Sequence, residues 1–110
     1  MKHIVIFGGT GERGRPLCRQ LLSEGNQVTC MDDESTGWVC LIADCLDNDN
    51  FKFIRSKIEH FEMGDFKEKI DLIYDYTPTN ANPVGKENIR KLATQNGCRI
   101  IRKTEQNVRE

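Results

Sequence analysis

Short apolar runs alternate along the chain with stretches in which apolar residues repeat at helical spacing. Runs rich in β-branched and aromatic residues, bounded by turn residues, predict strands. Five such runs are present, over residues 3–7, 27–31, 51–55, 70–76 and 99–102. The chain therefore has the strand content of one small sheet.

Helices are predicted between these strands. Apolar side chains share one stripe over 15–23, and Gly25 ends that segment. Over 38–46 the apolar positions follow i, i+3, i+4, i+7 and i+8, which favours a helix, although a strand over 39–43 is the alternative. A short helix over 65–69 and a longer one over 86–95, ended by Asn96-Gly97, complete the set, with a loop over 77–83. This alternation of strand and helix predicts an α/β fold: a parallel sheet covered by helices on both faces, in three layers.

Composition restricts the function classes. The 110 residues are enough for one domain, which we expect over 1–103 with a polar tail over 104–110. Sixteen Lys and Arg balance seventeen Asp and Glu, so we expect neither a nucleic-acid partner nor a membrane surface. No apolar run approaches the ~20 residues of a membrane span. Five cysteines without a C-x-x-C pair argue against a disulfide framework or a zinc site and favour a reducing, cytoplasmic location.

A glycine-rich turn is the most informative segment. Gly8, Gly11 and Gly14 have the spacing G-x-x-G-x-x-G between a predicted strand and a predicted helix. One glycine permits the tight turn, one lets a pyrophosphate approach the main chain, and one lets the helix pack close to the strand. The unpaired N–H groups at the helix start then hold phosphates. The turn predicts a dinucleotide-binding fold, and the alternative is that these glycines serve only a tight strand–helix turn.

Acids after the second strand extend this prediction. Asp32 stands 18 residues after Gly14, where a carboxylate accepts the ribose hydroxyls of an adenosine. An acid here favours NAD over NADP, because a 2′-phosphate would meet negative charge. Glu12 would repel a pyrophosphate unless Arg13 or Arg15 offsets it. The predicted cofactor-binding residues are Gly8, Gly11, Glu12, Arg13, Gly14, Asp32 and Asp33, and an empty site is the alternative.

Several segments resemble the N-terminal half of extended short-chain dehydrogenase/reductases, and above all their NAD-dependent sugar-nucleotide epimerases and dehydratases, including UDP-glucuronate decarboxylases. They are the glycine turn, VTCMDDESTG, NFKFIRSKI, IDLIYDYTPTNANP and NGCRII. The resemblance covers nearly the whole chain but about the first third of such an enzyme. It implies a Rossmann-like fold, with Gly8, Gly11 and Gly14 as phosphate-binding glycines and Asp32 as the ribose ligand.

The sequence departs from that family at the catalytic positions. The family uses a Y-x-x-x-K pair, whereas the tyrosines here, Tyr74 and Tyr76, are followed four residues later by Pro78 and Asn80. We therefore expect no catalytic residue in this chain and no C-terminal substrate lobe. Lys57 replaces an acid that the family places beside the adenine. The segment 74–78 replaces the small residues that border the nicotinamide ribose. For Tyr74-Asp75-Tyr76 within it, the alternatives are a pocket wall and ordinary strand packing.

Charged residues flank the last predicted strand. Arg99, Arg102 and Lys103 surround Ile100-Ile101, and charges on an edge strand prevent edge-to-edge aggregation. We therefore expect a five-stranded mini-domain of strand order 3-2-1-4-5, adapted to end there. The alternative is the decaying remnant of a longer gene.

These observations predict a stand-alone domain that binds NAD or another adenosine nucleotide without catalysis, as a sensor or regulatory module. A homodimer or a complex with a partner chain is compatible with this prediction. Two alternatives stay open: a subunit of an oxidoreductase or sugar-nucleotide-modifying enzyme that a partner completes, and an interaction module with an empty nucleotide site. His3 and His60 lack Cys or carboxylate neighbours at ligand spacing, so no metal site is expected.

Overall fold

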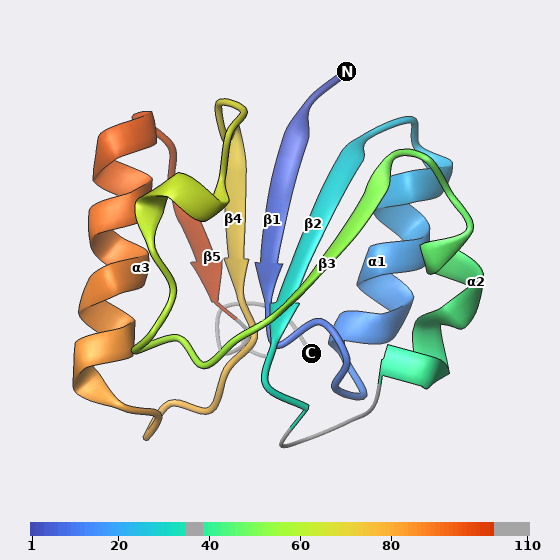
Figure 1. The fold of residues 1–110 in the computed structure, drawn as a ribbon. Coiled ribbons are helices and arrows are strands. Elements are labelled where there is room, and N and C mark those ends of the chain that lie inside the picture. Colours follow the sequence, from blue (N-terminus) through green and yellow to red (C-terminus); the bar gives the residue numbers. More distant parts are fainter. Residues whose placement is uncertain (35–38, 103–110) are drawn as a thin grey trace.

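Five parallel strands form the centre of the computed structural model, which describes residues 1–34 and 39–102. They are β1 (His3–Phe7), β2 (Gln27–Asp32), β3 (Phe51–Arg55), β4 (Leu72–Asp75) and β5 (Ile100–Arg102). Their order is β3-β2-β1-β4-β5, and every neighbouring pair is parallel (Figure 1). The predicted α/β fold and strand order 3-2-1-4-5 are therefore confirmed. Trp38 and the predicted tail, 104–110, lie outside the described residues.

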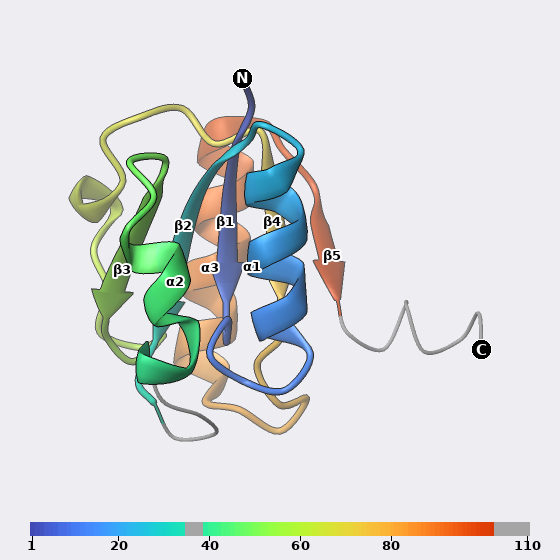
Figure 2. The same cartoon turned by 90° about the vertical axis from the view of Figure 1, so that its right-hand side faces the viewer.

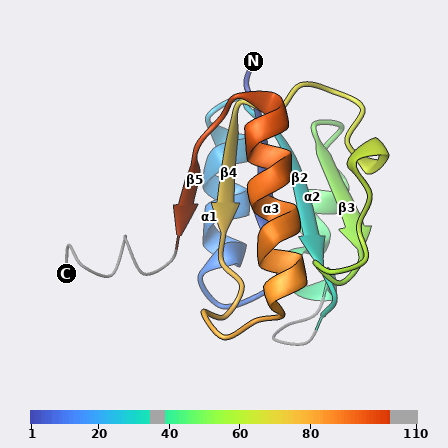
Figure 3. The same cartoon turned by 90° about the vertical axis from the view of Figure 1, so that its left-hand side faces the viewer.

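Helices cover both faces of the sheet. α1 (Gly14–Ser23), the 3₁₀ turn η1 (Val39–Ile42) and α2 (Ala43–Leu46) lie on one face (Figure 2). α3 (Pro83–Asn96) and the 3₁₀ turn η2 (Met63–Asp65) lie on the other (Figure 3). Each connection crosses between parallel strands, which brings all the carboxyl ends of the strands to one edge.

The sheet has an apolar core on each side. β1 lies at its centre, and its successive side chains point to opposite faces of the sheet. Because both faces are covered, β1 is buried along its whole length. Ile4 and Ile6 belong to the cluster under α1 and α2. Val5 and Phe7 belong to the cluster under α3, where Phe7 contacts the ring of Phe61 with 5.4 Å between centroids. A continuous HIVIF run is thus explained by a central parallel strand that is covered on both sides.

Several element boundaries differ from those predicted. The segment 65–69 is not a helix, since a single 3₁₀ turn occupies Met63–Asp65 and is closed by the reciprocal hydrogen bonds of Glu62 and Asp65. The alternative strand over 39–43 is wrong as well, because Val39–Ile42 is a 3₁₀ turn that leads into α2. β4 spans only Leu72–Asp75 of the predicted 70–76. The hydrogen bonds of Glu62 and Asp65 define the first of these turns, and the hydrophobic pattern does not report such local bonds.

α3 begins earlier than predicted, at Pro83. The side chain of Asn82 accepts a hydrogen bond from the Val84 N–H at 2.8 Å and caps the helix, and Pro83 stands in its first turn. The helix ends, as predicted, at Asn96-Gly97, where Gly97 adopts the left-handed conformation with φ 64°. Both ends of α3 therefore follow from short capping signals, and the first of them lies inside the segment predicted as a loop.

Three cysteines pack between the sheet and the helices α1 and α2. Cys18, Cys30 and Cys45 are buried there, and the Cys18 thiol donates to the Gly9 carbonyl at 3.8 Å. A hydrogen bond with the Cys18 thiol, together with burial, raises the pKa of Cys30 well above its ordinary value. Burial raises the pKa of Cys45 to about 11. These thiols act as small apolar core groups.

Alkylation should distinguish these buried thiols from Cys40, which is exposed. A pKa of about 11 instead of 9.0 lowers the thiolate fraction of Cys45 about a hundredfold at pH 8, and burial blocks access as well. We expect iodoacetamide to modify Cys40 of the folded protein first, with Cys18, Cys30 and Cys45 modified only after unfolding in urea. Peptide mass spectrometry over time gives the four rates. Equal rates at Cys40 and Cys45 in the folded protein would contradict the buried cluster.

Candidate functional site

Two adjoining clefts lie at the carboxyl edge of the sheet. The first, called here the edge cleft, has a volume of about 270 Å³ and extends from β2 across the segment after β3 to the segment after β4. The second, called here the turn cleft, has a volume of about 200 Å³ and lies at the glycine turn before α1. Gly8, Tyr76 and Pro78 line both. They meet beside the neighbouring strands β1 and β4, whose connections run to opposite faces of the sheet, the place where open α/β sheets bind ligands.

The edge cleft combines apolar walls with polar groups of both charges. Ile58 contributes apolar surface, together with Tyr76 and Pro78, and the fully buried Met31 also adjoins the cleft. The polar residues come from three separate segments, after β2, after β3 and after β4: Asp32, Asp33, Ser56, Lys57, Glu59, Thr77, Asn80 and Asn82. A concave site with apolar walls and converging polar groups can take a small molecule, and the polar share of this cleft is high.

The turn cleft is lined mainly by the glycine turn. Its lining residues are Gly8, Gly11, Glu12, Arg13, Gly14, Tyr76 and Pro78. The Arg15 N–H already donates to the Gly11 carbonyl at 3.0 Å, whereas within the described part of the chain the N–H groups of Glu12 and Gly14 donate no hydrogen bond. Unpaired N–H groups at a helix start, together with the positive end of the helix dipole, favour an anion, so the turn cleft is a candidate anion site.

Two of the glycines are required by the packing. A Cβ atom at Gly8 would lie 2.9 Å from the main-chain carbon of Tyr76, and the φ of Gly8 is +81°. A Cβ atom at Gly14 would lie 2.6 Å from the Gly8 carbonyl oxygen and 2.6 Å from the Gly9 Cα. Both contacts are with backbone, which cannot move aside as a side chain can. The start of α1 therefore rests directly on the turn, as the sequence predicted for a phosphate-binding turn.

Asp32 lines the edge cleft and holds the backbone of the glycine turn. It is 5% exposed, and its Oδ2 accepts the Thr10 N–H at 3.0 Å while its Oδ1 accepts the Glu34 N–H at 2.6 Å. The Arg15 guanidinium donates to the Thr10 carbonyl at 3.0 Å, so the turn is held from both sides. A carboxylate has about four acceptor positions, and these two bonds leave acceptor capacity toward the edge cleft. Asp32 can thus fix the glycine turn and bind a hydroxyl pair at once.

The segment after β3 is fixed against α3. A Cβ atom at Gly85 would lie 2.1 Å from Ile58 Cγ1, so the helix and the Ile58 side chain are in direct contact there. The Asn88 side chain donates to the Ile58 carbonyl at 3.1 Å. The apolar wall that Ile58 gives the edge cleft is therefore held in place by α3.

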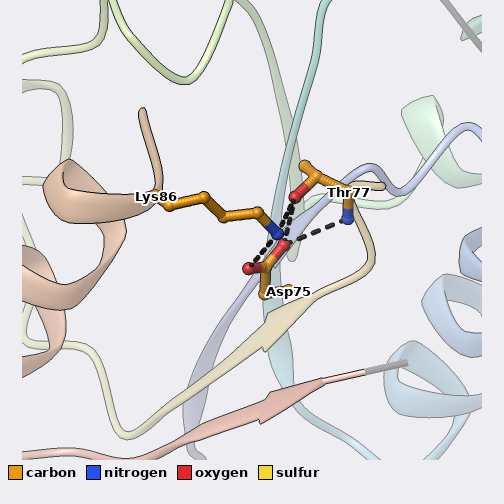
Figure 4. Close-up of polar contacts among 3 residues, drawn as sticks. All are labelled: Asp75, Thr77 and Lys86. Carbon is orange, nitrogen blue, oxygen red and sulfur yellow. Dashed lines mark hydrogen bonds and ion pairs between the residues drawn. The ribbon is translucent and has the colours of Figure 1, made fainter. Parts of the chain in front are cut away.

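A buried ion pair supports the other wall (Figure 4). Asp75 ends β4 and is 1% exposed, and Lys86 in the first turns of α3 donates to its Oδ2 at 2.9 Å. Lys86 also donates to the Thr77 hydroxyl at 2.8 Å. That hydroxyl and the Thr77 N–H both donate to Asp75 Oδ1, at 2.5 and 3.0 Å. This cluster ties the segment after β4, which lines the edge cleft, to the sheet and to α3.

The structure brings all seven predicted site residues to these clefts. Asp32 and Asp33 line the edge cleft, Gly8 lines both, and the remaining four line the turn cleft: Gly11, Glu12, Arg13 and Gly14. Their role in binding stays a prediction. Of Tyr74, Asp75 and Tyr76, Tyr76 lines both clefts, whereas Tyr74 packs on Tyr76 with 5.9 Å between ring centroids. The ion pair of Asp75 and Lys86 was not foreseen from the sequence.

Among the described residues, no group of three His, Cys, Asp or Glu side chains gathers in a way that would hold a metal ion. None of the described helices has the length and the apolar character needed to cross a bilayer.

Comparison with solved structures places the fold among sugar-nucleotide epimerases and dehydratases. A dTDP-glucose 4,6-dehydratase of Bacillus anthracis, solved in complex with NAD, superposes with a TM-score of 0.80 at 16% identity and covers 93% of this chain. A UDP-Glc/GlcNAc 4-epimerase of Campylobacter jejuni also gives a TM-score of 0.80, at 25% identity and 93% coverage. A UDP-glucose 4-epimerase of Thermotoga maritima, solved with UDP-glucose, gives 0.75 at 20% identity and 91% coverage.

The matched part is only a fraction of those proteins. The alignments cover 37%, 36% and 37% of the three chains, so this chain spans little more than a third of their length. No protein-family model matches the sequence, and no curated protein matches it. The comparisons thus agree in fold with the resemblance drawn from the sequence.

Proposed function

We propose that this chain binds an adenosine nucleotide at the two clefts, with NAD preferred to NADP, and that it performs no hydride transfer by itself. The observation that carries the proposal is the meeting of the turn cleft and the edge cleft at Gly8. A diphosphate in the turn cleft reaches the N–H groups of Glu12 and Gly14, and the nucleoside attached to it enters the edge cleft beside Asp32.

The comparisons support this ligand class. The Bacillus anthracis dehydratase was solved in complex with NAD, and its superposition covers 93% of this chain. The absence of a Y-x-x-x-K pair from the sequence supports a binding module, since the tyrosines here are followed four residues later by Pro78 and Asn80. A sensor or regulatory role fits a domain that binds the nucleotide without turning it over.

The charge of the edge cleft supports NAD over NADP. Asp32, Asp33 and Glu59 line it, against the single ammonium of Lys57 among the described residues that do so. A 2′-phosphate on the ribose would lie close to the carboxylates, and like charges in a partly buried site repel strongly. We therefore expect weaker binding of NADP.

A second candidate function follows from the size of the solved neighbours. This chain spans little more than a third of their length, so a partner chain that supplies the remainder would give an epimerase, dehydratase or decarboxylase of the sugar-nucleotide type. Under that alternative, the isolated chain binds NAD but a UDP-sugar is converted only when the partner is present.

Isothermal titration with NAD and NADP tests the proposed function. We expect saturable NAD binding, weaker NADP binding, and at least a tenfold loss of NAD affinity in Asp32→Ala, because two hydrogen bonds to a charged acceptor are lost. Asp47→Asn, which changes an exposed carboxylate at the end of α2, is the matched control and should bind like the unsubstituted chain.

Two results would contradict the proposal. If NAD, NADP, ADP and ATP all fail to bind, the remaining interpretation is an interaction module with an empty nucleotide site. Formation of NADH by the pure chain would show that it is an enzyme on its own. Circular dichroism of Asp32→Ala is needed beside the titration, since Asp32 also holds the Thr10 N–H.

A further inference from the structure

We infer that Asn96 is a site of spontaneous covalent modification, which the folded chain protects and which reacts when the last turn of α3 opens. The reaction is deamidation, in which the main-chain nitrogen of the next residue attacks the side-chain amide. Asn96 is the only asparagine of the chain that a glycine follows, and hydrogen bonds of the fold hold both members of the pair. This modification does not depend on the proposed nucleotide binding.

The pair Asn96-Gly97 has the composition that favours deamidation. In the first step the Gly97 nitrogen loses its proton and bonds to Asn96 Cγ. The bond from Cγ to Nδ2 breaks, and that nitrogen leaves with the proton as ammonia. Water then opens the resulting cyclic imide at one of its two carbonyl carbons and gives aspartate or isoaspartate. Glycine favours the ring because it has no side chain to obstruct the nitrogen and its backbone rotates freely.

Hydrogen bonds of the fold restrain both reacting groups. The Asn96 Oδ1 accepts the Ile70 N–H at 2.9 Å, and the Nδ2 donates to the Leu92 carbonyl at 2.9 Å. The side-chain amide is therefore fixed at both of its polar atoms. The Gly97 N–H donates to the Thr94 carbonyl at 3.2 Å in the cap of α3. Ring closure requires these bonds to break, because the Gly97 nitrogen must lose its proton and turn toward Asn96 Cγ.

The end of α3 is the part of the helix that opens with the smallest loss of buried contacts. Asn96 is the last residue of the helix, and helix ends open locally at a lower free energy than the buried middle does. The neighbouring residues Thr94 and Gln95 are exposed, whereas Ile89 and Leu92 are buried. The rate of deamidation should therefore be proportional to the fraction of chains in which this turn is open.

The products cannot restore the same hydrogen bonds. In aspartate, an oxygen takes the place of Nδ2 beside the Leu92 carbonyl, and neither oxygen can donate. The new charge also lies at the carboxyl end of α3, where the helix dipole disfavours an anion. In isoaspartate, the main chain gains one carbon before Gly97, which displaces the cap. A modified chain therefore keeps the end of α3 more open than an unmodified chain does.

Peptide mass spectrometry over time tests the protection. The whole chain is held folded and in urea at one pH and temperature, and we expect Asn96 to react at least about tenfold faster in urea. Glu24→Asn is the matched control, because it places a second Asn-Gly pair at an exposed helix end before Gly25, whose N–H donates to the Leu22 carbonyl at 3.0 Å.

In urea the two Asn-Gly pairs of this variant should react at rates that agree within about threefold, because the fold no longer distinguishes them. In the folded variant, the pair at position 24 should react several times faster than Asn96, since its side chain lacks the two bonds that fix the Asn96 amide. Equal rates at the two positions in the folded variant would overturn the inference. So would an Asn96 that reacts as fast in the folded chain as in urea.

Two charge variants test the effect of the modification. Asn96→Asp imitates one product, and Gln95→Glu makes the same change of charge at the exposed neighbouring position. We expect Asn96→Asp to lower the urea midpoint and to speed hydrogen exchange of the Cys98 N–H, which donates to the Ala93 carbonyl at 3.0 Å in the same cap. Gln95→Glu should change neither. Equal effects of the two variants would overturn the inference that a modified chain stays open, because the helix dipole alone would then account for them.

Discussion

Gly14→Ala is expected to lower the free energy of unfolding by about 2–3 kcal/mol, the upper part of the usual range for forcing an extra carbon into a closely packed site. The new Cβ would lie 2.6 Å from the Gly8 carbonyl oxygen and 2.6 Å from the Gly9 Cα. Real structures do not tolerate such distances, and both atoms belong to the main chain. Either α1 moves away from the turn or the turn changes shape, and in both cases the proposed anion site of the turn cleft is lost with the stability.

Gly64→Ala provides the matched control. Gly64 lies in the 3₁₀ turn η2, and a Cβ atom there would meet nothing within 4 Å. The same chemical change should therefore alter the free energy of unfolding by less than about 0.5 kcal/mol. Urea denaturation of the three proteins, followed by circular dichroism, measures both effects. Equal effects at the two positions would contradict the close contact between α1 and the glycine turn.

The comparison of Gly14 with Gly64 illustrates how much of the fold could be read from the sequence. The spacing of Gly8, Gly11 and Gly14 after an apolar run carries its own structural meaning, because a strand, a tight turn and a closely packed helix impose it together. The strand order was predicted from the alternation of strands and helices along the chain, and the structure confirms it. The prediction of a helix over 65–69 was wrong: a single 3₁₀ turn lies at Met63–Asp65 instead, held by local hydrogen bonds, and no periodicity marks such a turn.

Two kinds of site residue could be predicted from the sequence. One kind shapes the backbone, as the glycines of the turn do, and the other directly follows a strand. Asp32 directly ends β2, so its arrival at the sheet edge follows from the topology. Lys86 gives no such signal, because eleven positions separate it from Asp75 and only the docking of α3 brings the two charges together. The position of Lys86 on a buried side of α3, where an apolar residue would be usual, is the one hint the sequence contained.

Asp75 and Lys86 form a pair whose members depend on each other. The Asp75 side chain is fully buried and that of Lys86 is 15% exposed, so water screens their interaction poorly. The favourable contact between them offsets the loss of hydration that each charge suffers on folding. Removing the ammonium would leave a carboxylate with two hydrogen bonds from Thr77 and no countercharge in the interior.

Lys86→Met is therefore expected to lower the free energy of unfolding by about 3–5 kcal/mol, the range for breaking one partner out of a buried ion pair. Lys91→Met, an exposed change on the same helix, should cost less than about 0.5 kcal/mol. The double variant Asp75→Asn/Lys86→Met removes the unpaired charge and should recover at least half of the loss, because the penalty arises from the stranded carboxylate rather than from the missing contact. Urea denaturation measures all of these variants. If the double variant is less stable than Lys86→Met alone, then Asp75 stabilises the segment after β4 through its bonds to Thr77, and the ion pair is not what holds that wall of the edge cleft.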